Sequence, residues 1–235
     1  MKNFIKNITG RVLDVLFPRT CAVCDSTLLA HETHICTACS LEIPRTHFHK
    51  IKFNPMEQLF AGKIMFEHAS GFFFYEKGHP YANILHDLKY RNQPQLGQYF
   101  AGIYAQELLN DGCFTHIDCI IPVPLHRSKK AKRGYNQSEE IAKGFARVLG
   151  VPICTNIIIA NRAHESQTNK GTLERWQNTQ GIFTARNTDC LHHKHVLIVD
   201  DVVTTGATLL NTALTIADVP GIKISLATLG VARLE

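Results

Sequence analysis

The sequence lacks the long apolar runs that mark membrane-spanning or exported proteins. Residues 1–16 have apolar side chains at helical spacing, but Asn7, Gly10, Arg11 and Asp14 interrupt the continuous core that a secretory signal peptide needs. No later window has enough uninterrupted apolar residues to cross a bilayer. We therefore expect a cytoplasmic protein with an N-terminal helix and no membrane span.

Strong net charge, internal repeats and low-complexity segments are absent as well. The 25 basic and 20 acidic side chains leave a formal charge of +5. This charge favours an anionic partner but does not distinguish nucleotide phosphate from nucleic acid. Because 45% of the 235 residues are hydrophobic, the chain can build one ordinary domain plus a small appendage, which excludes a disordered protein.

The eight cysteines are unevenly placed, and four of them crowd one short segment. Two Cys-x-x-Cys pairs, Cys21 with Cys24 and Cys36 with Cys39, have eleven residues between them. Each pair can turn back onto one ion, and four thiolates complete a tetrahedral zinc site that has no open position for water. We expect a structural Zn²⁺ here, because a reducing compartment disfavours disulfides. Redox-active thiols or a loop disulfide are the alternatives.

Four histidines lie in or near the cysteine segment, at His31, His34, His47 and His49. They could compete with the cysteines as metal ligands or contact nucleic acid. Because the four cysteines already complete a ligand set, solvent-exposed surface histidines are the favoured interpretation.

After the cysteine segment the hydrophobic pattern changes to alternating strands and helices. This alternation predicts an α/β fold, with a mostly parallel sheet flanked by helices on both faces. We expect two domains: residues 1–52 with the N-terminal helix and the four-cysteine zinc module, and residues 53–235 with the α/β fold. The expected strands cover 71–75, 117–123, 153–159, 196–199 and 223–231, and the expected helices cover 82–90, 94–109, 138–149 and 207–216.

Two acids and a threonine-rich turn follow the strand at 196–199. Asp200 and Asp201 come at its carboxyl end, where open α/β sheets bind their ligands. The turn supplies hydroxyl and backbone N–H donors just before a helix, whose positive end attracts phosphate. The two carboxylates repel phosphate but suit the hydroxyls of a ribose, so the pattern predicts a phosphoribose pocket. The turn residues are Thr204, Thr205, Gly206, Ala207 and Thr208.

Two other folds that would explain these acids or this turn do not fit the sequence. A response-regulator receiver domain also has a strand that ends in two aspartates, but it needs roughly a hundred further residues. Only 34 residues follow Asp201. A Walker-type phosphate loop requires a Gly-Lys-Ser or Gly-Lys-Thr ending, which is missing here.

Residues 196–208 resemble the signature with which type I phosphoribosyltransferases bind phosphoribosyl pyrophosphate (PRPP). The resemblance implies that Asp200 and Asp201, the predicted catalytic residues, contact the ribose hydroxyls, and that the turn holds the 5-phosphate. It also implies the family's chemistry, in which pyrophosphate leaves the anomeric carbon while a nitrogen nucleophile adds. Mg²⁺ bridges pyrophosphate and ribose oxygens and neutralises the developing charge.

Two further segments complete the site that this resemblance implies. A basic loop after the strand at 117–123 would bind the pyrophosphate, which Arg can grip through two hydrogen bonds. A long polar segment between strands would form a flap over the site. A solvated basic face and an ordinary surface loop are the alternatives. The predicted pyrophosphate-loop residues are Arg127, Arg133, Asn136 and Gln137, and the predicted flap residues are Arg162, Gln167, Thr168 and Arg175.

The order of these features along nearly the whole chain resembles the ComF family, competence proteins that join a zinc module to a phosphoribosyltransferase domain. The residues that carry this likeness are the four cysteines and the segments 121–127, 133–137 and 167–183. The resemblance implies a role in natural transformation, the uptake of single-stranded DNA into the cytoplasm. DNA could then bind directly to the zinc module and the basic loop.

Three functions stay open at this point. The chain could be a metabolic phosphoribosyltransferase that acts on an unidentified nitrogen acceptor, without a DNA role. It could bind PRPP and also handle single-stranded DNA, or it could dock onto a competence helicase through its zinc module. No segment of the sequence identifies an acceptor.

Overall fold

The computed structural model describes residues 18–161 and 182–233. Within these ranges, no helix is long and apolar enough to cross a membrane. The expected features that lie outside them are the N-terminal helix, residues 1–16, and the flap residues Arg162, Gln167, Thr168 and Arg175.

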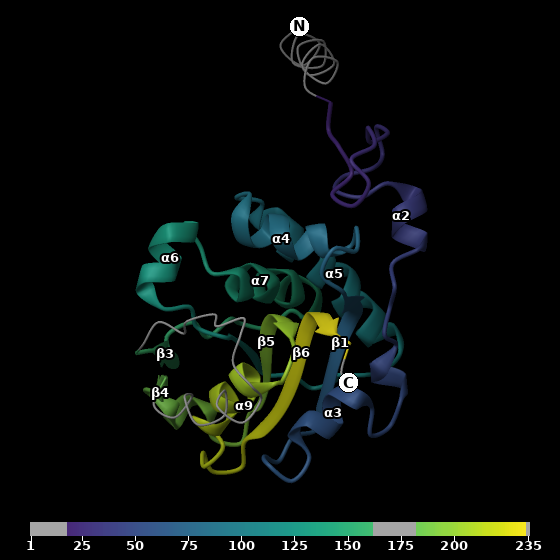
Figure 1. The fold of residues 1–235 in the computed structure, drawn as a ribbon. Helices are drawn as coiled ribbons and strands as arrows, with labels where there is room; N and C mark the ends of the chain where they lie inside the picture. Colours follow the sequence, from purple (N-terminus) through teal and green to yellow (C-terminus); the bar gives the residue numbers. More distant parts are fainter. Residues whose placement is uncertain (1–17, 162–181, 234–235) are drawn as a thin grey trace, which may run out of the picture.

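A four-stranded parallel sheet organises the chain (Figure 1). The strand order β1-β6-β5-β2 places the two C-terminal strands in the middle of the sheet. Strand β5 pairs with β6 from His195 opposite Lys223 to Val203 opposite Val231. The predicted α/β fold with a parallel sheet is confirmed. The strands are β1 (His68–Tyr75), β2 (Cys119–Pro122), β5 (His195–Val203) and β6 (Lys223–Ala232).

Helices cover both faces of the sheet (Figure 1). Successive side chains of a strand point to opposite faces, so β5 contributes to two apolar layers. Leu197 and Val199 belong to the layer with α4, α5 and α7, whereas Val196 and Ile198 belong to the layer with α3 and α9. These helices are α3 (Pro55–Phe60), α4 (Ala82–Tyr90), α5 (Pro94–Asn110), α7 (Gln137–Leu149) and α9 (Ala207–Leu214).

Helices α5 and α7 approach each other closely where α7 carries a glycine. A Cβ atom on Gly144 would lie 2.4 Å from the backbone oxygen of Gln98 and 2.7 Å from the Cβ of Ala101, both in α5. Real Cβ atoms do not come this close to a backbone oxygen, because the contact is far shorter than the sum of van der Waals radii. The absence of a side chain at Gly144 therefore sets the distance between the two helices.

The predicted strand at residues 153–159 differs from the structure. Among the described residues, this segment pairs with the parallel sheet only at one bridge, between Ile153 and Ile120. The chain then leaves the sheet and forms β3 (Ile158–Ala160), which pairs in antiparallel fashion with β4 (Phe183–Ala185). An apolar, β-branched run indicates a strand, but it does not indicate the partner, because pairing depends on where the rest of the fold places that strand.

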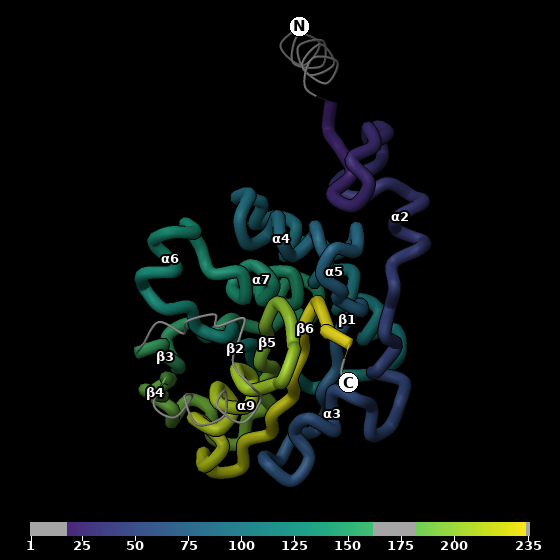
Figure 2. Tube along the Cα trace, in the orientation of Figure 1, coloured from purple at the N-terminus to yellow at the C-terminus, as the bar shows by residue number. Residues whose placement is uncertain are grey.

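The cysteine segment lies beside α4 and α5, and the chain then runs down past the sheet to α3 (Figure 2). The Tyr81 hydroxyl, just before α4, donates a hydrogen bond of 2.7 Å to the carbonyl of Cys39. Backbone hydrogen bonds pair residues 44–46 with residues 72–74 of β1. This pairing covers the edge of the sheet. The short elements of these segments are α2 (Thr37–Leu41) and η1 (Phe48–Lys50), and a further short element, η2 (Thr188–Leu191), lies between β4 and β5.

Candidate functional site

A cavity of about 270 Å³ opens beyond the carboxyl ends of β2 and β5. Open α/β sheets bind ligands at this position, because the loops there are free to vary. The wall combines both acids of β5 with side chains from α4, from α6 (Arg127–Arg133) and from the start of α7. Its polar side chains are Lys89, His126, Lys129, Arg133, Asn136, Gln137, Ser138, Asp200, Asp201 and Thr208.

The two acids lie within β5, which continues to Val203, and not after the strand as the sequence suggested. The Oδ1 atom of Asp200 accepts hydrogen bonds from the Ser138 hydroxyl at 2.8 Å and from the Asp201 backbone N–H at 2.9 Å. Burial and the neighbouring charge of Asp201 nevertheless raise the pKa of Asp200 to about 7. Its carboxylate charge is therefore poorly compensated near neutral pH, and a cationic or hydroxyl-bearing ligand would stabilise it.

Lys89 of α4 supplies a cation that the sequence analysis missed. Its Nζ lies 3.0 Å from Oδ1 of Asp201, and the two side chains are 21% and 12% exposed. Burial lowers the pKa of Lys89, but the attraction of Asp201 and Asp200 outweighs this effect, so the pKa is raised and the side chain stays charged. Ser138 was missed too, although it directly follows the predicted Asn136 and Gln137. For Lys89 no local signal existed.

Replacing Lys89 with Met is expected to lower the free energy of unfolding by about 1–3 kcal/mol, because the mostly buried Asp201 loses its cation. Urea unfolding at neutral pH measures this change. Lys77→Met, at an exposed position before α4, is the matched control and should change stability by less than about 0.5 kcal/mol. Adding Asp201→Asn to Lys89→Met should restore part of the loss. Equal stability of Lys89→Met and the wild-type protein would contradict this role of the ion pair.

The threonine-rich turn opens α9, as the sequence predicted. Gly206 has a φ of 75° and precedes the first helical residue. A Cβ atom there would lie 3.1 Å from the ring of Phe60, so both backbone conformation and space favour glycine. Thr208 lines the cavity, whereas residues 204–207 are not part of its wall. The structure therefore brings one side chain of the predicted phosphate cradle together with the two acids.

The basic segment after β2 is a helix, so its prediction as a loop is wrong. Helix α6 begins after His126, whose Nδ1 accepts a hydrogen bond from the N–H of Ser128 at 3.3 Å. It ends before Gly134, which has a φ of 85°. Gly134 is a local signal for the end of a helix, whereas histidine is not one of the usual N-cap residues. Five of its seven residues are Lys or Arg and none is buried, so α6 presents a basic surface next to the cavity.

Three of the four predicted pyrophosphate contacts line the same cavity as the acids. Arg133 lies there with its guanidinium 5.3 Å from the ring centre of Tyr90. Asn136 caps α7, and Gln137 is buried with an Nε2 atom that has no hydrogen-bond partner among the described residues. Arg127 lines a neighbouring cavity instead. The structure therefore groups all of these residues except Arg127.

The four cysteines converge, and their Sγ atoms all lie within 4.8 Å of one another. Cys24 and Cys36 have their sulfurs 3.8 Å apart, and tetrahedral Zn²⁺ with bonds of about 2.3 Å requires a separation of about 3.8 Å. Burial raises the pKa of the Cys39 thiol far above its usual range, so a thiolate there needs a bound cation. The cluster fits a structural Zn²⁺ with four sulfur ligands.

The histidines near this cluster are not all surface residues. His31 and His47 are exposed, as predicted. His34 is half-buried, with its ring centre 5.0 Å from that of Tyr99. The prediction is wrong for His49, whose side chain is only 1% exposed. The reason is a long-range one: the turn that carries His49 packs against α5, far away in the sequence.

Two family models match the chain. The phosphoribosyl transferase domain matches residues 94–230, which is more than half of the chain, and the double zinc ribbon domain matches residues 12–49. Lys89 lies outside the first of these matches. Helix α4 therefore adds a cation to the cavity from a part of the chain that the domain model does not cover.

Several known proteins are similar to parts of this chain. Competence protein F from Haemophilus influenzae is 34% identical over 93 residues, 39% of this chain and 41% of that protein. DNA utilization protein YhgH from Salmonella typhi is 30% identical over 137 residues, 57% of this chain and 60% of that protein. The matches thus span less than two thirds of either relative. Adenine phosphoribosyltransferase from Saccharomyces cerevisiae has a TM-score of 0.36 and 15% identity, over 59% of this chain and 69% of that chain.

These matches confirm the resemblance that the sequence motifs indicated. The zinc-ribbon match covers the four cysteines, and the domain match covers the two acids, the turn and the basic helix. The chain therefore belongs to the phosphoribosyl transferase domain family, and its N-terminal zinc-ribbon match and its similarity to Competence protein F agree with the resemblance to the ComF family.

Proposed function

We propose that this chain binds PRPP with Mg²⁺ in the cavity beyond β2 and β5, and that it handles single-stranded DNA in natural transformation. One observation supports PRPP as the ligand: acids and cations share a single cavity wall. The acids are Asp200 and Asp201, and the cations are Lys89, Lys129 and Arg133. PRPP needs both kinds of group, because its ribose hydroxyls donate hydrogen bonds to carboxylates and its phosphates attract cations.

Each group has a separate task in this proposal. Asp200 and Asp201 accept hydrogen bonds from the ribose hydroxyls and orient the sugar. As the hydroxyls replace Lys89 at Asp201, the Lys89 ammonium becomes available to the pyrophosphate. Thr208 and the N-terminal end of α9 hold the 5-phosphate, and Arg133 grips the pyrophosphate. The site thereby serves transfer of the phosphoribosyl group to a nitrogen acceptor.

The residues around the cavity fit a magnesium-bound ligand. The two acids supply the hard oxygen donors that Mg²⁺ prefers. The buried Nε2 of Gln137, which has no hydrogen-bond partner in the described part of the chain, can donate to a ligand oxygen. When bound, Mg²⁺ would neutralise charge on the pyrophosphate.

Two observations support the DNA role. The relatives are named Competence protein F and DNA utilization protein, and α6 has five Lys or Arg residues on an exposed helix. We further propose that residues 1–52 form a separate zinc module, which offers a surface for DNA or for a partner helicase. Residues 53–235 would then hold the PRPP site.

Calorimetric titration of the full chain with PRPP tests the ligand. We expect saturable binding with one PRPP per chain in the presence of Mg²⁺, and much weaker binding when EDTA replaces Mg²⁺. Ribose 5-phosphate and pyrophosphate should each bind more weakly than PRPP, because each leaves part of the site empty. No binding of PRPP at millimolar concentration in either condition would remove this assignment.

A salt titration of single-stranded DNA affinity tests the second part independently. Each phosphate contact contributes about 0.7 to the slope of log affinity against log salt. The double variant Arg127→Ala with Lys132→Ala removes two basic residues of α6 that do not line the PRPP cavity. It should lower the slope by about 1.4 and leave PRPP binding unchanged. An affinity that does not respond to salt would remove the DNA role.

A further inference from the structure

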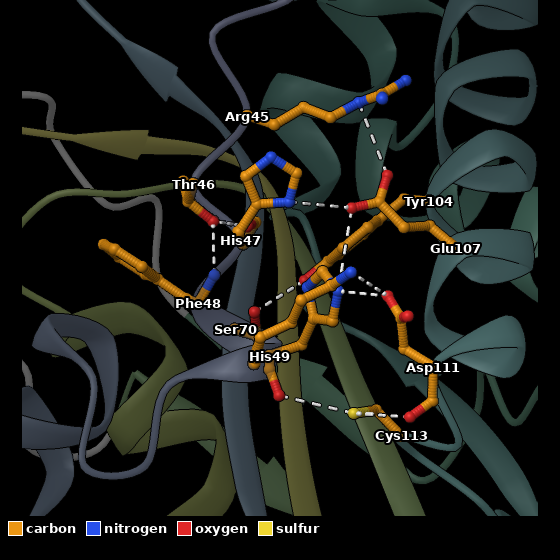
Figure 3. Close-up of polar contacts among 12 residues, drawn as sticks. Arg45, Thr46, His47, Phe48, His49, Ser70, Tyr104, Glu107, Asp111 and Cys113 are labelled. Atoms are coloured by element: carbon orange, nitrogen blue, oxygen red, sulfur yellow. Dashed lines mark hydrogen bonds and ion pairs between the residues drawn. The ribbon is translucent and has the colours of Figure 1, made fainter.

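A second cluster of metal-ligating side chains shares no residue with the cavity wall or with the cysteine cluster. It joins His47 and His49, on either side of Phe48, to Glu107 in the last turns of α5. One donor atom from each of the three side chains lies within 4.8 Å of the others. Figure 3 shows contacts from both imidazole rings converging on one Glu107 carboxylate.

The donor separations suit a small divalent ion. His47 Nδ1 lies 3.6 Å and His49 Nε2 lies 3.7 Å from Oε1 of Glu107. In a tetrahedral site with metal–ligand bonds of about 2.0–2.2 Å, donor atoms are about 3.3–3.6 Å apart. A small inward shift of each side chain is therefore enough. Asp111 Oδ2 lies 2.9 Å from His49 Nε2, a hydrogen-bond distance, and is not one of the three converging donors.

The backbone holds both histidines in place. His47 has a φ of 52°, in the left-handed region that residues other than glycine rarely adopt. Phe48, between the two histidines, is only 5% exposed, with its ring centre 5.7 Å from that of Phe74. Its backbone N–H donates a hydrogen bond of 3.1 Å to the Thr46 hydroxyl. The turn is thus anchored, and the imidazoles lose little freedom when they bind an ion.

Helix α5 presents two carboxylates to this turn. Glu107 and Asp111 are four residues apart, so they lie on the same face. Arg45 Nε is 3.4 Å from Oε2 of Glu107, which leaves Oε1 for the histidines. Lys50 Nζ is 3.0 Å from Asp111 Oδ2, but its side chain is 52% exposed. Lys50 can keep its pairing with Asp111 while Glu107 binds the ion.

The burial of His49 keeps its imidazole ring out of contact with water. Its side chain is 1% exposed, and its Nδ1 has no hydrogen-bond partner within the described ranges. Without a metal, Nε2 can only share a proton with Asp111. A metal ion at Nε2 would replace this hydrogen bond with a stronger interaction, whereas Nδ1 is without a partner in either case.

We propose that His47, His49 and Glu107 bind a divalent transition-metal ion of the zinc class. Imidazole nitrogen combined with carboxylate oxygen is a donor set that Zn²⁺ takes, whereas Mg²⁺ and Ca²⁺ prefer oxygen alone. Three protein ligands leave the fourth position of a tetrahedral site to a water molecule. The ion ties the segment that connects the cysteine module with the sheet to α5.

Zinc content and coordination test the proposal. The full chain is supplied with a slight excess of Zn²⁺, desalted and examined by elemental analysis and X-ray absorption. We expect two Zn²⁺ per chain, with sulfur neighbours at about 2.3 Å and nitrogen or oxygen neighbours at about 2.0–2.1 Å. His47→Ala, at a half-exposed position, should keep one Zn²⁺ with sulfur neighbours only. The affinity of this variant for the second Zn²⁺, measured in competition with a chromophoric chelator, should fall at least about 100-fold.

Two further variants test whether loss of the second Zn²⁺ is specific to the ligands of the cluster. Glu107→Gln preserves the shape of the side chain and should also lose the second Zn²⁺. His192→Ala removes an exposed histidine outside the cluster and should keep both ions. Circular dichroism shows which variants are folded. One Zn²⁺ in the wild-type chain, or two in both folded cluster variants, would overturn the proposal.

Discussion

The Asp200→Asn variant is expected to be more stable than the wild-type protein at neutral pH and to lose at least about 100-fold in affinity for PRPP with Mg²⁺. Affinity falls because an amide is a weaker partner for ribose hydroxyls than a carboxylate. Stability rises because the asparagine Oδ1 can still accept the hydrogen bonds from Ser138 and Asp201, while the poorly compensated charge is gone.

The gain in stability depends on pH in a defined direction. Burial and the Asp201 charge raise the pKa of Asp200 to about 7 in the folded chain, against about 3.9 in an unfolded one. Below both values the carboxyl is neutral in each state and costs nothing. As pH rises from roughly 4 to 7, ionisation favours the unfolded chain, and the wild-type protein loses stability that Asp200→Asn keeps. The difference should reach roughly 1–3 kcal/mol above pH 7.

Urea unfolding at pH 4, 6 and 8 measures the stability difference, and calorimetry with PRPP measures the affinity. Asp218→Asn, an exposed acid away from the cavity, is the matched control and should change neither quantity. A stability gain that is as large at pH 4 as at pH 8 would show that the charge of Asp200 is not its cause. Unchanged PRPP affinity would show that Asp200 does not contact PRPP, and the prediction for stability would still stand.

The second large effect is expected from Gly144→Ala, which should lower the free energy of unfolding by about 3 kcal/mol. The added Cβ would lie 2.4 Å from the backbone oxygen of Gln98. A backbone atom cannot move aside as the end of a side chain can, so α7 must shift away from α5. Because α7 begins with Gln137 and Ser138 in the cavity wall, PRPP affinity should fall as well.

Gly102→Ala, in the facing helix α5, is the control for Gly144→Ala. A Cβ atom there would meet no atom within 4 Å. The same substitution should raise stability by up to about 1 kcal/mol, because alanine favours helix more than glycine does. Thermal and urea unfolding of both variants check the pair. If the two variants had equal stability, close packing at Gly144 would not be what sets the distance between the helices.

Local features of the chain could be predicted from sequence because their causes are local. Helix α4 covers residues 82–90 as expected, and α7 begins one residue before the expected start. Apolar spacing, together with a capping Asn136 and a C-terminal Gly150, defines α7. The adjacent acids, the turn before α9 and the four cysteines are likewise close in sequence. Their mutual placement follows from strand direction and short-loop geometry.

Contacts between distant segments could not be predicted in the same way. Lys89 meets Asp201, and His49 meets Glu107, across more than fifty residues in each case. No spacing rule connects such positions. Residues 153–159 illustrate the same limit, since their apolar pattern indicated a strand but not its departure from the parallel sheet into the pairing of β3 with β4.

The sequence by itself determined the α/β class, the cysteine cluster, and the two acids followed by a turn that opens a helix, because each depends on residues a few positions apart. Only the tertiary structure decided which cations face those acids, which glycine permits helix contact, and that His49 is buried against α5. These depend on the strand order β1-β6-β5-β2 and on the helices packed over it. That order results from the whole core packing at once, and no single segment encodes it.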